Sequence, residues 1–440
     1  MNDRPRPRPG FTLALTGDLL HTRRLAPFAD ADEAFAAVVS RLRTADATYG
    51  NLELTVAERD DPEAWVWSVT EDWALASEPH VIADIRDLGF DIVGRANNHA
   101  MDRGPSGLRT TSRLLEDVGV VHAGAGEDRS QASAPRFLET PRGRVGLVSV
   151  TTSPSPRDVA PALDAFAGLA PRPGIHALGL QPVVTLPGET HALLQQLHDR
   201  MPDSVGEWMS GEPLNLFRTR FVAGDELAIE YVPDAGERDE ILRSLRRSAQ
   251  QADVTILAVH AHQGDNDPAH PLPYLRALAH DAVAAGADVV AVSGPHVPAP
   301  VEIHEGKVIL YGLSNFVWSD LGGPLPEYIW RLTRAAAGDH VDPRSMSEAD
   351  LIEMLGDDAF ADPWVFRAAF AEVVFGELGI DEVRVCPVDL GFSRPLTRRG
   401  IPRSPDDDVA REICDRFATI SSSFGTKLDL ADGVATVKLS

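Results

Sequence analysis

The chain has 440 residues and a formal net charge of −25, a sign that repels phosphate backbones and anionic lipid heads and so excludes nucleic acid and membrane surfaces as expected partners. No apolar run approaches the roughly 20 residues that a membrane-spanning helix needs. Only Cys386 and Cys414 are present, too few for a disulfide framework, which predicts a cytoplasmic protein.

Residues 1–10 are rich in Arg and Pro and no apolar segment follows them, which predicts a disordered tail rather than a secretion signal. After this tail, short apolar segments alternate with amphipathic ones, as is typical of an α/β protein. Up to residue 151, the expected strands are 11–16, 47–54, 91–94 and 145–150, and the expected helices are 32–43, 79–88 and 107–118.

The regular pattern is lost from residue 152 to residue 251, where prolines and glycines cluster, and we expect an insertion that covers the site. The alternation then resumes with strands at 254–259, 288–292 and 307–310 and a helix at 272–285. Residues 322–363 are a second expected insertion. The predicted core therefore comprises 11–151, 252–321 and 364–440, the last with two strands within 372–385 and a helix at 408–417.

Polar residues follow the ends of these strands. Because ligands of open α/β sheets bind beyond the carboxyl ends of the strands, we expect these side chains to converge. The candidates are Asp18, Glu53, Asn97, Asn98, His99, Asp102, His260, His262, His296 and Asn315. A lone Asp after a strand is usually a turn residue or a helix cap, but the ordered array is more specific than any member. Phosphate-binding glycine loops and a nucleophile elbow are absent from the sequence.

The order of these motifs resembles that of the CapA-type proteins of poly-γ-glutamate synthesis, a branch of the calcineurin-like metallophosphoesterase superfamily. The most specific strings are Asn97-Asn98-His99 with Asp102 three residues on, and Gly294-Pro295-His296. The resemblance covers most of the chain except the two insertions. It implies a four-layer α/β/β/α sandwich with an inserted Pro-rich segment and metal at the strand ends.

The resemblance also implies a role for each matching residue. The implied metal ligands are Glu53 as the bridging carboxylate, Asn98 with His260 or His262 at one metal, and Asp18 with His296 at the other. His99 matches the catalytic histidine beside the metals, and Asp102 is placed to orient it.

The chain departs from the superfamily pattern at two positions. The first motif is normally Asp-x-His, but Leu20 stands where that histidine would be, and Ser293 occupies the position of a second late histidine. Each metal site therefore lacks one imidazole, which predicts a single divalent cation. Its expected ligands are Glu53, Asn98, Asn97, one of His260 and His262, and waters. This oxygen-rich set favours Ca²⁺, with Mg²⁺ or Mn²⁺ as alternatives.

With one metal site lost, Asp18 with His296 and Asp102 with His99 are expected to form two carboxylate–imidazole pairs. Two such pairs suit proton removal and return at a carbon next to a carbonyl, with the cation stabilising the enolate-like intermediate. The chain is similar to the CapA-like epimerases that invert the C-terminal tryptophan of lasso-peptide precursors, so we expect a metal-dependent peptide epimerase. Expected contacts to the precursor peptide are Trp65, Trp67, Trp73 and Asn315.

Two other functions stay open at this point. A metal-dependent hydrolase of phosphoesters or γ-glutamyl amides, with His99 as the acid, is supported by the retention of Asn98, His260 and His262. A capsule-assembly scaffold would keep the fold without catalysis.

Overall fold

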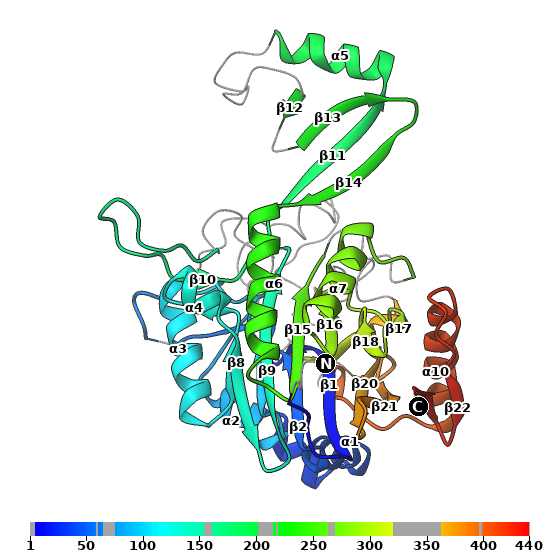
Figure 1. Ribbon diagram of the computed structural model, residues 1–440. Coiled ribbons are helices and arrows are strands. Elements are labelled where there is room, and N and C mark those ends of the chain that lie inside the picture. The colour runs from blue at the N-terminus through cyan, green and yellow to red at the C-terminus, as the bar shows by residue number, and fades with distance from the viewer. Residues whose placement is uncertain are drawn as a thin grey trace, which may run out of the picture.

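The computed structural model describes residues 5–58, 60–64, 75–153, 161–200, 214–216, 219–262, 269–319, 362–395 and 398–439. Within these residues the chain forms two large sheets that face each other, with helices on both outer sides (Figure 1). A smaller unit stands apart from this body. None of the helices in the described ranges is both long and apolar enough to cross a membrane.

The larger sheet has nine strands among the described residues. In spatial order they are β22 (Asp429–Ala431), β23 (Val434–Lys438), β21 (Ile380–Asp389), β20 (Arg367–Phe375), β1 (Phe11–Leu20), β2 (Ala47–Asn51), β5 (Ile92–Gly94) and β6 (Val121–Ala123), with β19 (Asn315–Trp318) also paired to β1. The strands β1, β2, β5 and β6 run parallel, and β20 pairs antiparallel to β1. The C-terminal strands thus extend the sheet that the N-terminal strands begin.

The second sheet has six strands among the described residues. They are β17 (Val301–His304), β18 (Lys307–Leu310), β16 (Val289–Ser293), β15 (Val254–His260), β9 (Gly143–Thr151) and β8 (Arg136–Thr140). Every residue of β15 is buried, because this central parallel strand is covered on both faces. That burial explains why its sequence is a continuous apolar run rather than an alternating one.

Three hydrophobic clusters mark the three interfaces of a four-layer sandwich. One joins α1 (Glu33–Thr44), α2 (His80–Asp87) and α3 (Gly104–Asp117) to the larger sheet. The second lies between the two sheets, and the third packs α6 (Ala235–Ala249) and α7 (Pro273–Ala285) on the smaller sheet. The helix α10 (Asp407–Ser422) joins the inter-sheet cluster through Ile413 and Phe417. The α/β/β/α architecture that the motif resemblance implied is therefore confirmed.

Local sequence explains where these helices begin and which face they bury. The side chain of Asp32 accepts a hydrogen bond from the backbone of Phe35 and caps α1. The buried residues of α1 recur every three or four positions, so one stripe of the helix faces the sheet: Phe35, Val38, Val39 and Leu42. The helix α7 is followed by Gly286 as its C-terminal cap. The φ of Gly286 is 110°, a value that residues with a side chain rarely adopt.

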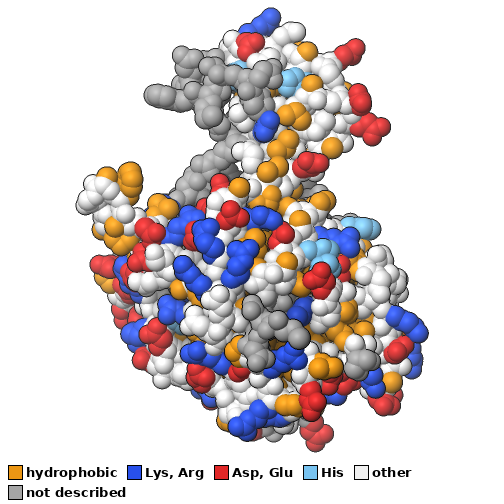
Figure 2. All heavy atoms as spheres, in the orientation of Figure 1, with side chains coloured by type: hydrophobic (Ala, Val, Ile, Leu, Met, Phe, Trp, Pro, Cys, Tyr) orange, Lys and Arg blue, Asp and Glu red, His pale blue; other side chains and the backbone are white. Residues whose placement is uncertain are grey.

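The insertion is shorter than the sequence pattern predicted. Its main part is a four-stranded sheet of described residues, formed by β12 (Leu214–Leu216), β13 (Thr219–Gly224), β11 (Leu180–Pro187) and β14 (Ala228–Pro233), with the helix α5 (Gly188–His198). The following helix, α6, was placed in the insertion by the sequence but packs on β9 and β15 of the core. Figure 2 shows the inserted unit standing clear of the core with hydrophobic side chains on its surface. Leu193 and Ile229 are among the exposed hydrophobic residues of this unit. That it covers the site stays a prediction.

Minor elements complete the described chain. They are β3 (Thr55–Val56) with β4 (Ala76–Ser77), β7 (Ala125–Gly126) with β10 (Gly174–Ile175), α4 (Arg129–Ser133), and the 3₁₀ helices η1 (Ala26–Asp30) and η5 (Pro363–Phe366). The expected disordered tail is partly wrong. Pro7 is buried, and the backbone of Arg8 donates a hydrogen bond of 2.8 Å to Arg142. The second expected insertion lies outside the described residues except for its last two positions.

Candidate metal centre

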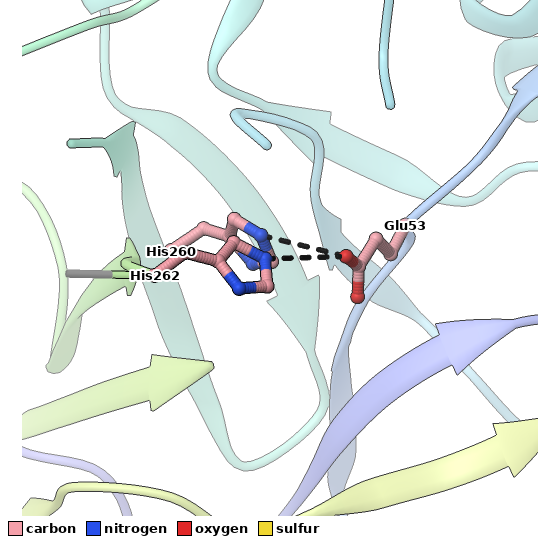
Figure 3. Close-up of side chains that lie close together, drawn as sticks. All are labelled: Glu53, His260 and His262. Carbon is pink, nitrogen blue, oxygen red and sulfur yellow. Dashed lines mark ion pairs between the residues drawn. The ribbon is translucent and has the colours of Figure 1, made fainter. Parts of the chain in front are cut away.

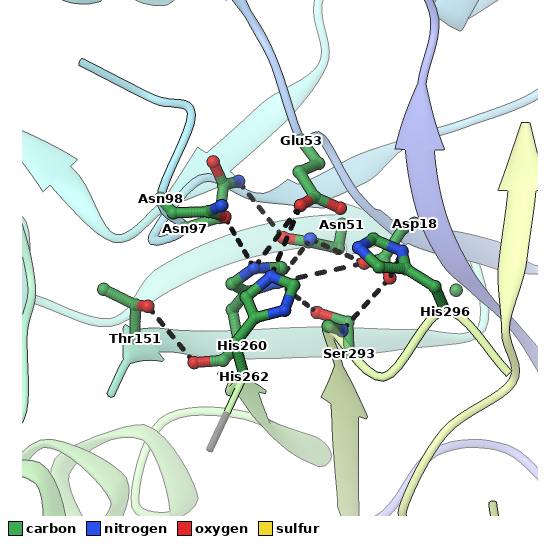
Figure 4. A network of polar contacts seen from close by, with 12 residues as sticks. Asp18, Asn51, Glu53, Asn97, Asn98, Thr151, His260, His262, Ser293 and His296 are labelled. Carbon is green, nitrogen blue, oxygen red and sulfur yellow. Dashed lines mark hydrogen bonds and ion pairs between the residues drawn. The ribbon is translucent and has the colours of Figure 1, made fainter. Parts of the chain in front are cut away.

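Strand ends from both sheets meet at one edge of the sandwich and bring the predicted polar residues together (Figure 4). Asp18 lies near the end of β1, Glu53 two residues after β2, His260 at the end of β15 and His296 three residues after β16. The amide nitrogen of Asn51 lies 2.8 Å from Asp18 Oδ1 and 3.2 Å from His260 Nδ1, so it joins the two sheets directly.

One ligand group consists of Glu53 with both strand-end histidines (Figure 3). Glu53 Oε1 lies 3.5 Å from His260 Nε2 and 3.8 Å from His262 Nε2. The amide oxygen of Asn98 lies 2.8 Å from His260 Nε2. Two atoms that each lie about 2.1 Å from one ion are roughly 3 to 4 Å apart, so these separations suit common ligands of a cation. The sequence left the choice between the two histidines open, and the structure brings both to Glu53.

A second ligand group shares Glu53 with the first. Asp18, Glu53 and His296 present ligand atoms that lie within 4.8 Å of one another. Glu53 therefore stands between two sets of ligands, as expected of a bridging carboxylate. The expectation that Asp18 and His296 had been left without a metal between them is not supported by this placement.

Asp18 and His296 do not form the hydrogen-bonded pair that the sequence predicted. His296 Nδ1 lies 3.6 Å from Asp18 Oδ2, but only 2.7 Å from the amide oxygen of Asn315. Both oxygens of Asp18 accept other hydrogen bonds, from Asn51 at 2.8 Å and from the backbone of Gly294 at 3.1 Å. The residue that orients the His296 ring is therefore Asn315.

The backbone around His296 is held in an unusual conformation. His296 has a φ of 56° and Ser314 a φ of 67°, values that L residues with a side chain seldom adopt and that cost about 1–3 kcal/mol each. The hydroxyl of Ser314 donates a 2.9 Å hydrogen bond to the carbonyl of His296 and so ties the two segments together. Strain of this kind is commonly kept where a side chain must be aimed at a site.

His99 and Asp102, the second predicted pair, lie in direct contact. His99 Nδ1 lies 2.7 Å from Asp102 Oδ2, and the same carboxylate oxygen accepts a hydrogen bond of 2.7 Å from the backbone of Leu75. Asp102 is buried, and the side chain of His99 is 12% exposed. A carboxylate on Nδ1 fixes the tautomer so that Nε2 can exchange a proton at the site.

Burial sets the charge state of the centre. Burial, followed by the negative charge of Asp18, raises the pKa of Glu53 to about 8. Neither oxygen of Glu53 accepts a hydrogen bond from the described residues. Burial, then the charges of His262, His296 and His99, holds the pKa of His260 well below its usual value. The centre thus contains a neutral imidazole and a carboxylate whose ionisation needs a nearby positive charge.

Two sequence predictions change in this setting, those on Asn97 and Asn315. Asn97 is fully buried, and its amide donates to the carbonyl of Leu52 at 2.8 Å and accepts from the backbone of His99 at 3.1 Å, so it shapes the loop instead of offering a ligand. Asn315, expected to contact substrate, is also fully buried and orients His296. The three expected peptide-contact tryptophans lie outside the described residues: Trp65, Trp67 and Trp73.

Two residues of the centre had no assigned role. Asn51 is not among the residues that the sequence analysis selects, although its even spacing from Glu53 is a sign that both face one side. Ser293, which occupies a histidine position of the superfamily, has its hydroxyl 2.9 Å from His260 Nδ1. A hydroxyl that replaces a ligand can still orient a neighbouring ligand, which the loss of an imidazole alone did not indicate.

The described donor set suits a divalent cation. Glu53 is a buried carboxylate whose oxygens accept no hydrogen bond from the described residues. The side chains around it are the imidazoles of His260, His262 and His296, the carboxylate of Asp18 and the amide of Asn98. More imidazole is present than the sequence predicted. This favours transition cations over Ca²⁺, since Ca²⁺ takes oxygen ligands and imidazole suits Zn²⁺, Fe²⁺ or Ni²⁺.

Comparison with known proteins places the chain among capsule-related sequences. It is 34% identical over 445 residues to the uncharacterized protein y4sH of Sinorhizobium fredii, covering 98% of this chain and 93% of that protein. It is 24% identical over 331 residues to the PGA biosynthesis protein CapA of Bacillus subtilis, covering 74% of this chain and 66% of that protein. For the capsule biosynthesis protein CapA of Bacillus anthracis, the identity is 21% over 313 residues, or 70% and 60% of the two chains.

Among solved structures, a putative 5'-nucleotidase from Staphylococcus aureus in complex with alpha-ketoglutarate superposes with a TM-score of 0.37 and 9% identity. The match covers 92% of this chain and 58% of that chain, and it is too weak to bear on function. The family profile described as bacterial capsule synthesis protein PGA_cap matches residues 12–320, which include the whole candidate centre. The chain therefore belongs to the PGA_cap family of bacterial capsule synthesis proteins.

Proposed function

We propose that this chain is a metal-dependent hydrolase with its centre built on Glu53. The observation that carries the proposal is the state of this carboxylate. It is fully buried, accepts no hydrogen bond from the described residues, and belongs to both ligand groups of the centre. A buried carboxylate that accepts no hydrogen bond is costly to ionise, so a cation held at these ligands would stabilise its charged form.

When bound, a divalent cation at these ligands would polarise a phosphoryl or carbonyl oxygen of the substrate as a Lewis acid. The side chains of the protein would do the remaining work. His99, oriented by Asp102, would hold a proton at Nε2 and pass it to the leaving group. Asn51, Ser293 and Asn315 would keep the ligand histidines and Asp18 in place.

The substrate is proposed from the family. Its members include proteins named for capsule and PGA biosynthesis, which suggests a γ-glutamyl amide. A phosphoester would use the same residues, since both reactions add water to a centre that an oxygen-bound cation polarises. The net charge of −25 disfavours a long polyanionic chain, so we favour a short or neutral γ-glutamyl compound.

The test begins with chelator-treated protein to which Mn²⁺, Zn²⁺, Mg²⁺ or Ca²⁺ is returned. Hydrolysis of a γ-glutamyl anilide and of a generic aryl phosphodiester is then measured. We expect turnover of one of them with a transition cation, and loss of that turnover together with cation binding in Glu53→Gln. A matched control is His80→Ala, which removes an exposed imidazole beside Glu78. Turnover that persists in Glu53→Gln would overturn the proposal.

Epimerisation at a peptide Cα is the second candidate, and one observation favours it. His99 and His296 both lie near enough to Glu53 for their charges to lower its pKa, and each has its own orienting partner, Asp102 and Asn315. Two oriented imidazoles at one centre suit proton removal and return. Incubating C-terminal-tryptophan precursor peptides with the protein in deuterated water would separate the candidates, since only epimerisation places deuterium at Cα.

A further inference from the structure

A second cluster of imidazoles and a carboxylate lies on the outer face of the smaller sheet, under α7. Figure 1 shows α7 lying over this sheet, with β16, β17 and β18 beside it. Glu302 and His304 are two apart on β17 and therefore point to the same face of the sheet. Arg276 and His280 are four apart on α7, so they lie on one side of the helix. The two residues on α7 face the two residues on β17.

The contacts within this cluster converge on one carboxylate. His280 Nε2 lies 3.0 Å from Glu302 Oε1, and the hydroxyl of Tyr311 donates a hydrogen bond of 2.8 Å to Oε2. Arg276 donates to Oε1 at 3.2 Å. The rings of His280 and His304 stack with their centroids 3.8 Å apart and their planes 3° from parallel. The hydroxyl of Tyr311 thus holds Glu302 Oε2, while Oε1 faces the imidazole of His280.

Exposure makes the cluster accessible from solvent. The side chain of Glu302 is 5% exposed and that of His280 is 30% exposed, while His304 is half-buried. The carboxylate is therefore held in place, while both imidazoles are partly exposed to solvent. One carboxylate with two imidazoles is the type of ligand set that binds transition ions in proteins.

We propose that His280, Glu302 and His304 form a second metal site, separate from the centre at Glu53, for a divalent transition cation such as Zn²⁺. Their ligand atoms lie within 4.8 Å of one another. The 3.0 Å separation of His280 Nε2 and Glu302 Oε1 lies at the short end of the roughly 3 to 4 Å between two neighbouring ligands of one ion. One ring must rotate, because two parallel stacked imidazoles cannot both direct a nitrogen lone pair at the same ion.

The site is distinct from the centre at Glu53. Strand β17 runs antiparallel to β18, and β18 runs parallel to β16, so His304 lies toward the end of the sheet opposite the Ser293–His296 loop. A cation here would join α7 to β17, which is a stabilising role rather than a catalytic one. Arg276 competes for the same carboxylate oxygen, and its guanidinium also lies 5.0 Å from the ring of Phe424, where it can remain when the cation binds.

The test uses untagged, chelator-treated full-length chain and Zn²⁺ alone as the probe. Bound Zn²⁺ per chain is measured by competition with a chromophoric chelator, in parallel with the thermal unfolding midpoint. We expect the double variant His280→Ala/His304→Ala to bind one Zn²⁺ ion fewer than the unmodified chain and to lose part of the Zn²⁺-dependent rise in midpoint. Arg276→Gln should tighten binding at this site by about two- to fivefold, since it removes a partly exposed competing ion pair.

Two controls separate this site from the centre. His80→Ala, an exposed histidine beside Glu78, should leave the Zn²⁺ count unchanged. Glu53→Gln should lower the count independently, so that its effect and that of the double variant add. Each variant is first checked for an unchanged midpoint without Zn²⁺. An equal Zn²⁺ count in the double variant and the unmodified chain would overturn the proposal, whatever the result at Glu53.

Discussion

The Nδ1 atom of His296 lies 2.7 Å from the amide oxygen of Asn315 and 3.6 Å from Asp18 Oδ2. The Asn315 amide nitrogen lies 3.1 Å from the carbonyl of Val365, which orients the amide so that its oxygen faces the ring. His296 therefore carries its proton on Nδ1, and its Nε2 lone pair is directed elsewhere. A fully buried residue on β19 thus decides how a residue in the loop after β16 can act.

Asn315→Leu removes this acceptor and keeps a similar volume. We expect activity or cation affinity to fall by about 10–100-fold, as is usual when the residue that orients a ligand histidine is lost. Turnover and bound cation per chain are the measurements. Asn315→Asp, which keeps an acceptor for His296, should retain more of both. Equal behaviour of the two variants would show that the hydrogen bond to His296 is not what matters.

The His99–Asp102 pair predicts a loss of turnover without a loss of metal. His99→Ala should lower kcat by about 10²–10⁴-fold, because the proton donor is removed. Cation binding should persist, since His99 belongs to neither ligand group. Asp102→Asn should have a smaller effect and should move the pH profile, because Asp102 acts through the His99 ring. If His99→Ala also empties the centre of metal, its assigned role is wrong.

The raised pKa of Glu53 predicts how metal-free protein responds to pH. In the folded chain this pKa is about 8, against 4.5 for the ordinary value, so between these values the folded state holds a proton that the unfolded state has released. The free energy of unfolding should therefore fall as pH rises from about 4.5 to about 8. Denaturant titrations across this range measure it. Glu53→Gln should flatten the dependence, and a saturating divalent cation should reverse it.

Gly17 is predicted to be irreplaceable for a steric reason. A Cβ atom added there would lie 1.7 Å from the carbonyl oxygen of Ser314, which is backbone and cannot swing away. Gly17→Ala should lower the free energy of unfolding by at least about 2 kcal/mol and weaken cation binding, because it pushes β19 from β1 beside Asp18. Gly188→Ala is the matched control, since nothing lies within 4 Å of its added Cβ. Chemical denaturation of both variants decides the matter.

Asp84 predicts a stability effect away from the centre. It is fully buried, and hydrogen bonds from His21, Leu25 and Ala26 overcome its burial and lower its pKa to about 2. The contribution of the Asp84 carboxylate to the free energy of unfolding is thus present above about pH 4 and is lost as pH falls toward about 2. Asp84→Ala should lower the free energy of unfolding by about 3 kcal/mol at neutral pH. Asp87→Ala, at an exposed position of the same helix, should change it by less than about 0.5 kcal/mol.

Much of the core could be predicted because its strands and helices carry strong local patterns. The run from Val254 to Val259 is apolar throughout, as a strand buried on both faces must be, and the capped helix after Asp32 has a regular apolar stripe. The inserted sheet escaped detection because it is partly exposed and contains Pro182 and Pro187 within β11, so neither period dominates. The sequence also contains no clear signal for the end of the inserted sheet, so the predicted insertion includes the following helix, α6.

The members of the centre were predictable, but their pairing was not. Strand-end motifs indicated that Asp18, Glu53 and the histidines would meet. Which atoms would touch depends on contacts between segments far apart in the chain, such as β19 beside β1, and on the positive φ of His296 and Ser314. A local pattern contains no information on such contacts. The sequence therefore predicts that Asp18 pairs with His296, whereas the partner of the His296 ring is Asn315.

The centre is divided between the two sheets. Asp18, Asn51 and Glu53 come from the larger one, and His260, His262 and His296 come from the smaller one or its connections. A partly folded chain in which only one of the two sheets has formed therefore lacks a complete metal site, even if that sheet is native. A cation bound by these side chains would also stabilise the packing of the two sheets against each other. Cation binding and the packing of the sheets are therefore thermodynamically coupled.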